Sequence, residues 1–77
     1  ARAKARRLAK KWRCTIEIER NNVADVNYWV DPPDDLLESI LDVAECDGRI
    51  CHCWTEVVEK LEAYIKCWEQ QGIEATK

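Results

Sequence analysis

Residues 14–30 alternate between apolar and polar side chains, and this pattern constrains the fold more than any other feature of the chain. Cys14, Ile16 and Ile18 fall on one face of an extended segment, and the alternation is repeated in residues 24–30. A period of two with β-branched residues predicts strands that are buried on one face. Because a single hairpin is only marginally stable in water, other segments must cover that face.

The connection between the two strands decides which residues pair. A two-residue turn would place an apolar side chain opposite a charged one, so we expect a three-residue turn at residues 21–23, or a five-residue loop in the same register. Asn21 and Asn22 tolerate the left-handed backbone that such turns need. The predicted pairs are Ile18 with Val26, Ile16 with Tyr28 and Cys14 with Val30.

Three helices are predicted around the hairpin. The first is a basic helix over residues 1–12, the second spans 34–47 after two prolines, and the third spans 50–71, with a frayed tail at 72–77. The expected fold is a single α+β domain in the order helix–strand–strand–helix–helix. In it, three helices cover one face of an antiparallel β-hairpin. No apolar run is long enough to cross a bilayer.

The charges divide sharply along the chain. Residues 1–13 contain seven of the twelve Lys and Arg residues and no Asp or Glu, although the whole chain has a net charge of −3. One interpretation is an arm that binds nucleic acid or another anion. The other is a basic helix packed on an acidic body. The spacing of Ala5, Leu8, Ala9 and Trp12 along one helical face favours packing and makes nucleic acid a poor candidate partner.

The five cysteines are interpreted mainly as disulfide partners, because a 77-residue core stabilises a fold only weakly. In the expected topology, Cys14 and Cys67 lie at one end of the molecule and form one bridge. Cys46 lies at the other end and pairs with Cys53 or with Cys51. If Cys46 pairs with Cys53, the remaining free thiol is Cys51. Sequence alone leaves the connectivity open.

A metal or catalytic role for the same residues is not expected. Cys46, Cys51, His52 and Cys53 would have to supply three consecutive ligands, and Cys67 lies about 21 Å further along a helix. His52 and its neighbouring cysteines point in different directions on a helix, so a nucleophile with its base is not predicted. We therefore expect no enzyme activity, no metal and no cofactor.

Four residues are candidates for contact with a partner. Trp29 and Asn27 fall on the strand face assigned to solvent, where an exposed aromatic side chain is typical of protein contacts. Trp29 covering Thr15 across the hairpin is the structural alternative. Arg6 and Lys10 belong to the basic helix and would contribute to any contact made by that helix.

Three segments, "ARAKARRLAKKW", "DPPDDLLESILD" and "WTEVVEKLEAYIK", show idealised patterning and charge pairing. On these segments the chain resembles a computationally designed (de novo) disulfide-stabilised miniprotein. The resemblance implies a non-catalytic scaffold or protein-binding module, monomeric, with a target protein as partner and no natural localisation. The alternatives are a small secreted cysteine-rich protein and an anion or nucleic-acid binder that uses the basic N-terminal helix.

Overall fold

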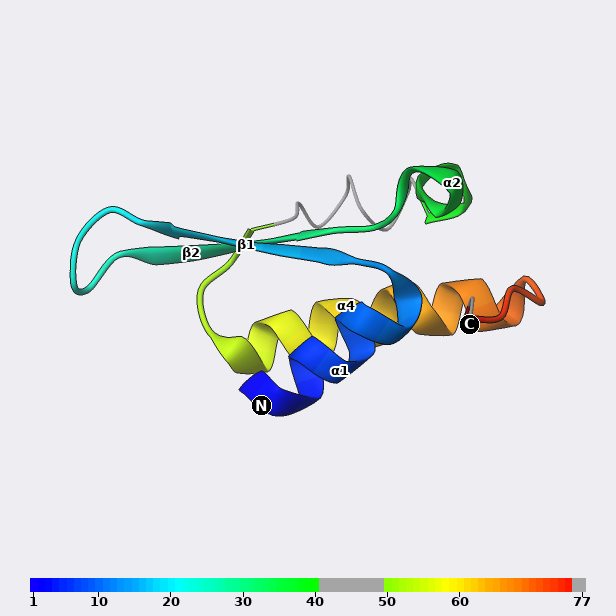
Figure 1. The fold of residues 1–77 in the computed structure, drawn as a ribbon, viewed down its shortest axis with the longest axis horizontal. Coiled ribbons are helices and arrows are strands. Elements are labelled where there is room, and N and C mark those ends of the chain that lie inside the picture. Colours follow the sequence, from blue (N-terminus) through cyan, green and yellow to red (C-terminus); the bar gives the residue numbers. More distant parts are fainter. Residues whose placement is uncertain (41–49, 76–77) are drawn as a thin grey trace.

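The computed structural model describes residues 1–40 and 50–75. Within these ranges the order of elements is helix, strand, strand, helix, strand, helix, which is an α+β fold with a three-stranded antiparallel sheet (Figure 1). The helices are α1 (Arg2–Trp12), α2 (Asp34–Leu37), the 3-10 helix η1 (Glu38–Ile40) and α4 (Trp54–Gln70), and the strands are β1 (Thr15–Arg20), β2 (Val26–Asp31) and β3 (Ile50–Cys51).

The hairpin of β1 and β2 is present, but its register differs from the prediction by two residues. Ile18 pairs with Tyr28, Ile16 pairs with Val30, and residues 21–25 form a five-residue loop. In this loop the side chain of Asn22 accepts hydrogen bonds from the backbone N–H groups of Ala24 and Asp25, at 2.8 and 2.9 Å. A shift of two residues keeps every side chain on its predicted face. Loop chemistry rather than apolar pairing therefore selects between these two registers.

Two helices cover one face of the sheet, and the expected cover by three is not confirmed. Helices α1 and α4 lie side by side on the same side of the sheet (Figure 1). Helix α2 lies beyond the end of β2, and the following 3-10 helix contacts the C-terminal part of α4. The indole N–H of Trp68 donates to the carbonyl of Leu36 in α2 at 3.3 Å, and Gln71 Nε2 donates to the carbonyl of Ser39 in the 3-10 helix at 2.8 Å.

The third strand replaces the start of the last predicted helix. Ile50 and Cys51 pair with Trp29 and Tyr28, and helix α4 begins only at Trp54. Of the predicted second helix, 34–47, the described residues form α2 and then a 3-10 helix to Ile40, and residues 41–47 lie outside the described part of the chain. Long-range strand pairing has therefore overridden the helical periodicity that begins at Ile50.

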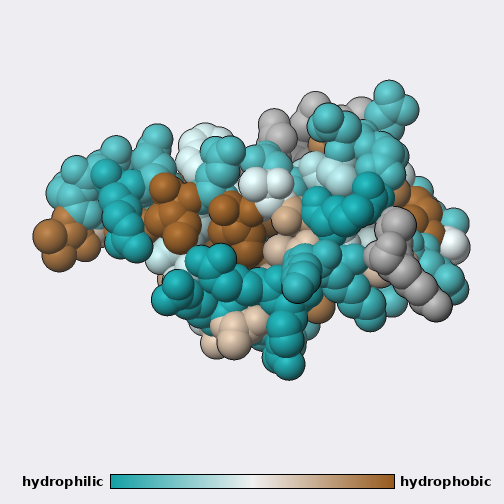
Figure 2. Space-filling model, viewed as in Figure 1, coloured by the Kyte–Doolittle hydropathy of each residue, from teal (hydrophilic) through white to brown (hydrophobic). Residues whose placement is uncertain are grey.

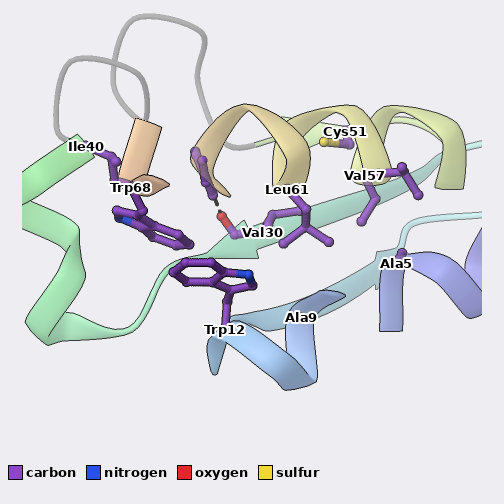
Figure 3. Close-up of a cluster of buried hydrophobic side chains, with 11 residues drawn as sticks. Ala5, Ala9, Trp12, Val30, Ile40, Cys51, Val57, Leu61 and Trp68 are labelled. Atoms are coloured by element: carbon purple, nitrogen blue, oxygen red, sulfur yellow. Dashed lines mark hydrogen bonds between the residues drawn. The ribbon is translucent and has the colours of Figure 1, made fainter. Parts of the chain in front are cut away.

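The core lies between α4, α1 and the helix-facing side of β2. Trp68 is fully buried, and its ring stacks on that of Trp12 (Figure 3). The two ring centroids are 5.0 Å apart. Leu61 and Val57 continue the buried stripe of α4, and small alanines on α1 allow the two helices to approach closely. Tyr64 is fully buried and donates from its hydroxyl to the Val30 carbonyl at 3.4 Å.

Both long helices end in the same hydrogen-bonded motif. At the end of α4, the N–H of Ile73 donates to Trp68 and the N–H of Gly72 donates to Glu69, with Gly72 at a φ of 81°. This is a Schellman motif, in which glycine adopts the left-handed conformation without strain. It turns Ile73 back against the core, so the tail predicted to fray is packed at this position.

Candidate functional site

The face of the sheet opposite α1 and α4, called the outer face below, carries the predicted contact residue Trp29. Its ring is half-buried, and in the sheet it lies between Glu17 of β1 and Ile50 of β3. The neighbour expected from sequence was Thr15, but the observed register pairs Thr15 with Asp31. Ile50 keeps 44% of its surface exposed. Trp29 and Ile50 thus form an aromatic–aliphatic pair on the outer face.

Asn27 lies on the same face and is tied to the neighbouring strand. Its side-chain amide donates to Glu19 at 3.3 Å, across the ladder position where these two residues pair. Glu17 and Glu19 are both exposed. The outer face of β1 is therefore acidic, whereas its helix-facing side carries Ile16 and Ile18.

The hairpin extends beyond the two helices that support it (Figure 1). Ile18 lies on the helix-facing side but is 37% exposed, and Val23 in the loop is fully exposed. Figure 2 shows apolar surface along this projecting part of the molecule. Exposed aliphatic side chains on a projecting hairpin are available for contact with another molecule.

Arg6 and Lys10 lie on α1, on the other side of the sheet from Trp29 and Asn27. The Arg6 guanidinium lies 5.5 Å from the centroid of the Trp54 ring, an arrangement typical of a cation–π contact. Arg6 and Lys10 line an open hollow of about 210 Å³ between α1 and β1, together with Ala9, Cys14 and Ile16. The structure therefore divides the predicted contact residues between two sites, separated by the edge of β1.

The predicted disulfides are wrong. Cys14, Cys51, Cys53 and Cys67 are all free thiols, and Cys46 lies outside the described residues. Cys14 and Cys67 are at the same end, since they adjoin the stacked pair Trp12 and Trp68, but their sulfurs have different neighbours.

The two thiols lie against different groups. The Cys14 thiol lies 3.9 Å from the Trp12 carbonyl, and the Cys67 sulfur accepts from Gln71 Nε2 at 3.8 Å. A disulfide joins two sulfurs about 2 Å apart, and no two of the four described cysteines lie at that distance.

Two of the thiols are poor nucleophiles in the folded protein. Burial raises the pKa of the Cys14 thiol to about 11, against a small opposing effect of Arg13. Burial also raises the pKa of the Cys51 thiol, so Cys51 is free, as expected, but buried. Because the thiolate is the reactive form, neither side chain is activated for attack near neutral pH.

The segment before α4 brings His52, Cys53 and Glu56 together through Glu56. Its carboxylate accepts from the backbone N–H of His52 at 3.1 Å and lies 3.8 Å from the Cys53 sulfur. In this arrangement Glu56 satisfies a backbone donor at the start of α4, which is a structural role. Among residues 1–40 and 50–75, no three His, Cys, Asp or Glu side chains are grouped as a metal ion would need.

Ile50 was not found from sequence as a part of the site, and the pattern did not show which strand edge stays free. Ile50 was assigned to a helix because it stands four residues before Trp54 and shares that residue's face. An edge strand cannot be recognised from a single strand pattern, because the position of β1 in the sheet depends on the pairing of β2 with β3. The charged face of β1, with Glu17 and Glu19, is the sequence signal that edge strands commonly carry.

Within the described residues, no helix is both long enough and apolar enough to cross a membrane. Comparisons with protein-family models, with curated proteins and with solved structures found no match to this chain.

Proposed function

We propose that the chain is a non-catalytic scaffold or protein-binding module, monomeric in solution, which contacts a target protein through its hairpin. Its origin as a designed protein, implied by the resemblance given above, is part of this proposal. The observation that carries it is the exposure of Ile50 beside Trp29 on the outer face, together with exposed Ile18 and Val23 on the projecting hairpin. Aromatic residues next to exposed aliphatic ones are typical centres of protein interfaces.

A selection from a randomised peptide library on the folded chain tests this function. We expect enriched peptides to bind at least tenfold more weakly to Trp29→Ala and to Ile50→Asp, because each substitution removes part of the aromatic–aliphatic pair. Gln70→Ala, at an exposed position of α4, is the control and should bind them unchanged. Circular dichroism of each variant verifies that the helices persist.

Two results would contradict the proposed function. The first is a selection that enriches no peptide. The second is a set of enriched peptides that bind Trp29→Ala and Ile50→Asp as well as the unmodified chain.

Binding of anions or nucleic acid by α1 is the second candidate function. It is supported by a run of exposed cations, Arg7, Lys10 and Lys11. Other cations of the helix are already in contact with the body, since Lys4 pairs with Glu62 at 3.2 Å and Arg13 pairs with Asp35 at 2.8 Å. These contacts reduce the charge that α1 presents to an anion.

Heparin chromatography tests this second function. An anion-binding helix would give retention that falls steeply with salt, and that is lost when Arg6, Arg7, Lys10 and Lys11 are changed to Gln. Equal elution of the two proteins at low salt would reject it.

A further inference from the structure

The free edge of β1 offers a second kind of contact. In the described sheet β1 is an outer strand, paired only with β2. The N–H of Asn21 donates to the Asp25 carbonyl at 3.0 Å, which identifies this pair as a hydrogen-bonded one. Hydrogen-bonded and non-hydrogen-bonded pairs alternate in an antiparallel ladder. The backbone N–H and C=O groups of Ile16, Ile18 and Arg20 therefore point away from β2, along the free edge.

The two sides of this edge differ in chemistry. On the outer face, a strand added beside β1 would place side chains next to Glu17 and Glu19, which are both exposed. On the helix-facing side, it would place side chains next to Ile16 and Ile18. The hollow of about 210 Å³ adjoins Ile16 on that side and has room for a branched aliphatic side chain.

A second copy of the chain fits this edge poorly. The two antiparallel pairings of β1 with itself that overlap most while keeping Ile16 and Ile18 on the helix-facing side place Glu17 opposite Glu17 or opposite Glu19 of the second copy. Like charges directly opposite each other destabilise a sheet. The same two glutamates would be matched by Lys or Arg on a different strand.

We infer that the free edge of β1 accepts an extended segment of a partner protein by strand addition, and that this segment alternates basic residues, next to Glu17 and Glu19, with branched aliphatic residues, next to Ile16 and Ile18. The inference rests on the proposed function, since it names the class of partner that the module binds. Backbone hydrogen bonds at the edge supply affinity, while the two rows of side chains supply selectivity.

A titration of the full chain with blocked heptapeptides of alternating Lys and Val, followed by amide chemical shifts, tests this inference. We expect shift changes centred on Ile16, Ile18 and Arg20, and binding about tenfold weaker for the peptide with Glu in place of Lys. A double variant, Glu17→Lys with Glu19→Lys, should prefer the Glu peptide. Glu69→Lys with Glu74→Lys, which changes the net charge equally at exposed positions outside the sheet, should keep the original preference.

Backbone methylation separates strand addition from simple charge attraction. Methyl groups on alternate peptide nitrogens should abolish binding when they block the edge that faces β1, and should leave it within about twofold when they are on the other edge. Equal binding by the two methylated peptides, equal binding by the Lys and Glu peptides, or shift changes confined to α1 would overturn the inference. So would a dimer in analytical ultracentrifugation whose interface protects the Ile16 and Ile18 amides.

Failure of the inference and failure of the proposed function give different results. If library peptides bind in a manner that depends on Trp29 while the alternating peptides do not bind, only strand addition at β1 is rejected. If neither class of peptide binds, both proposals are rejected.

Discussion

The two ends of the hairpin belong to one sheet but differ in what supports them. At the base, where β2 meets the helices, Val30 is fully buried and lies in one core with Trp68 and Tyr64. At the tip, residues 21–25 are exposed, and the loop is held by hydrogen bonds of Asn22 and Asn21 within the loop itself. Tertiary packing therefore stabilises the base, whereas local hydrogen bonds shape the tip, which leaves the tip available for contact with a partner.

The largest effect on stability is expected at the base. Trp68→Ala removes a fully buried ring that stacks on Trp12 and donates to Leu36, so we expect a loss of about 3–5 kcal/mol in the free energy of unfolding. A core of this size stabilises the fold by only a few kcal/mol, so most of the variant should be unfolded. Urea denaturation followed by circular dichroism measures the loss. A larger loss for Trp29→Ala than for Trp68→Ala would contradict the account.

The partly buried thiol of Cys14 at the base should make stability depend on pH. Cys14 has a pKa of about 11 in the folded chain against 9.0 for an unperturbed thiol, so the folded state resists its ionisation. Stability is then complete below about pH 9 and falls as the pH rises toward 11. We expect a fall of about 1–2 kcal/mol, smaller than the whole shift implies, because the thiol is partly exposed.

Denaturation of the unmodified chain and of Cys14→Ala between pH 7 and pH 10.5 isolates this effect, since the two proteins differ only at Cys14. The free energy of unfolding should fall less with rising pH for Cys14→Ala than for the unmodified chain. The two curves of stability against pH should therefore converge or cross. Parallel curves would show that Cys14 ionises as easily in the folded chain as in the unfolded one.

The ends of the two long helices offer a matched pair of substitutions. Gly72 and Arg13 both have left-handed backbones, with φ of 81° and 59°, but only one of them is glycine. Gly72→Ala should cost about 1 kcal/mol, since an added Cβ meets no atom within 4 Å and only backbone strain remains. Arg13→Gly should stabilise the chain by a smaller amount, because it also loses the exposed pair with Asp35. A destabilised Arg13→Gly variant would show that this pair outweighs the strain.

The smallest effect is expected at the tip. Val23→Ser replaces a fully exposed side chain, so stability should change by less than about 0.5 kcal/mol. Differential scanning calorimetry would detect a larger change as a shift of the melting temperature. A clear loss would show that the tip is packed against another part of the molecule.

Some parts of the fold could be predicted because they depend on local patterns. The strand alternation around Ile16 and Tyr28 found both strands and their faces, since the period of two is visible in the sequence. The alternation could not fix the register, because a shift of two residues leaves every side chain on the same face. The hydrogen bonds that Asn22 accepts in the loop decide between the two registers. Strand β3 could not be found because its two residues pair with Trp29 and Tyr28, which are distant in sequence.

The candidate site was predictable only in part. Trp29 and Asn27 were correctly assigned to one face, since that assignment needs only the parity of the strand. The disulfide between Cys14 and Cys67 was predicted from the ends of the elements where they lie, but residue spacing does not reveal how closely two sulfurs approach, and both thiols are free. The order of the strands was needed to show that, of the two hairpin strands, β1 is the one with a free edge.

Residue-resolved hydrogen exchange along β1 shows whether β1 is an edge strand whose outward backbone N–H groups are free. In the observed register, the amides of Glu17 and Glu19 face β2, whereas those of Ile16 and Ile18 face outward. The account predicts slow exchange at Glu17 and Glu19 and fast exchange at Ile16 and Ile18. Equal protection at all four amides, or the reverse alternation, would contradict it.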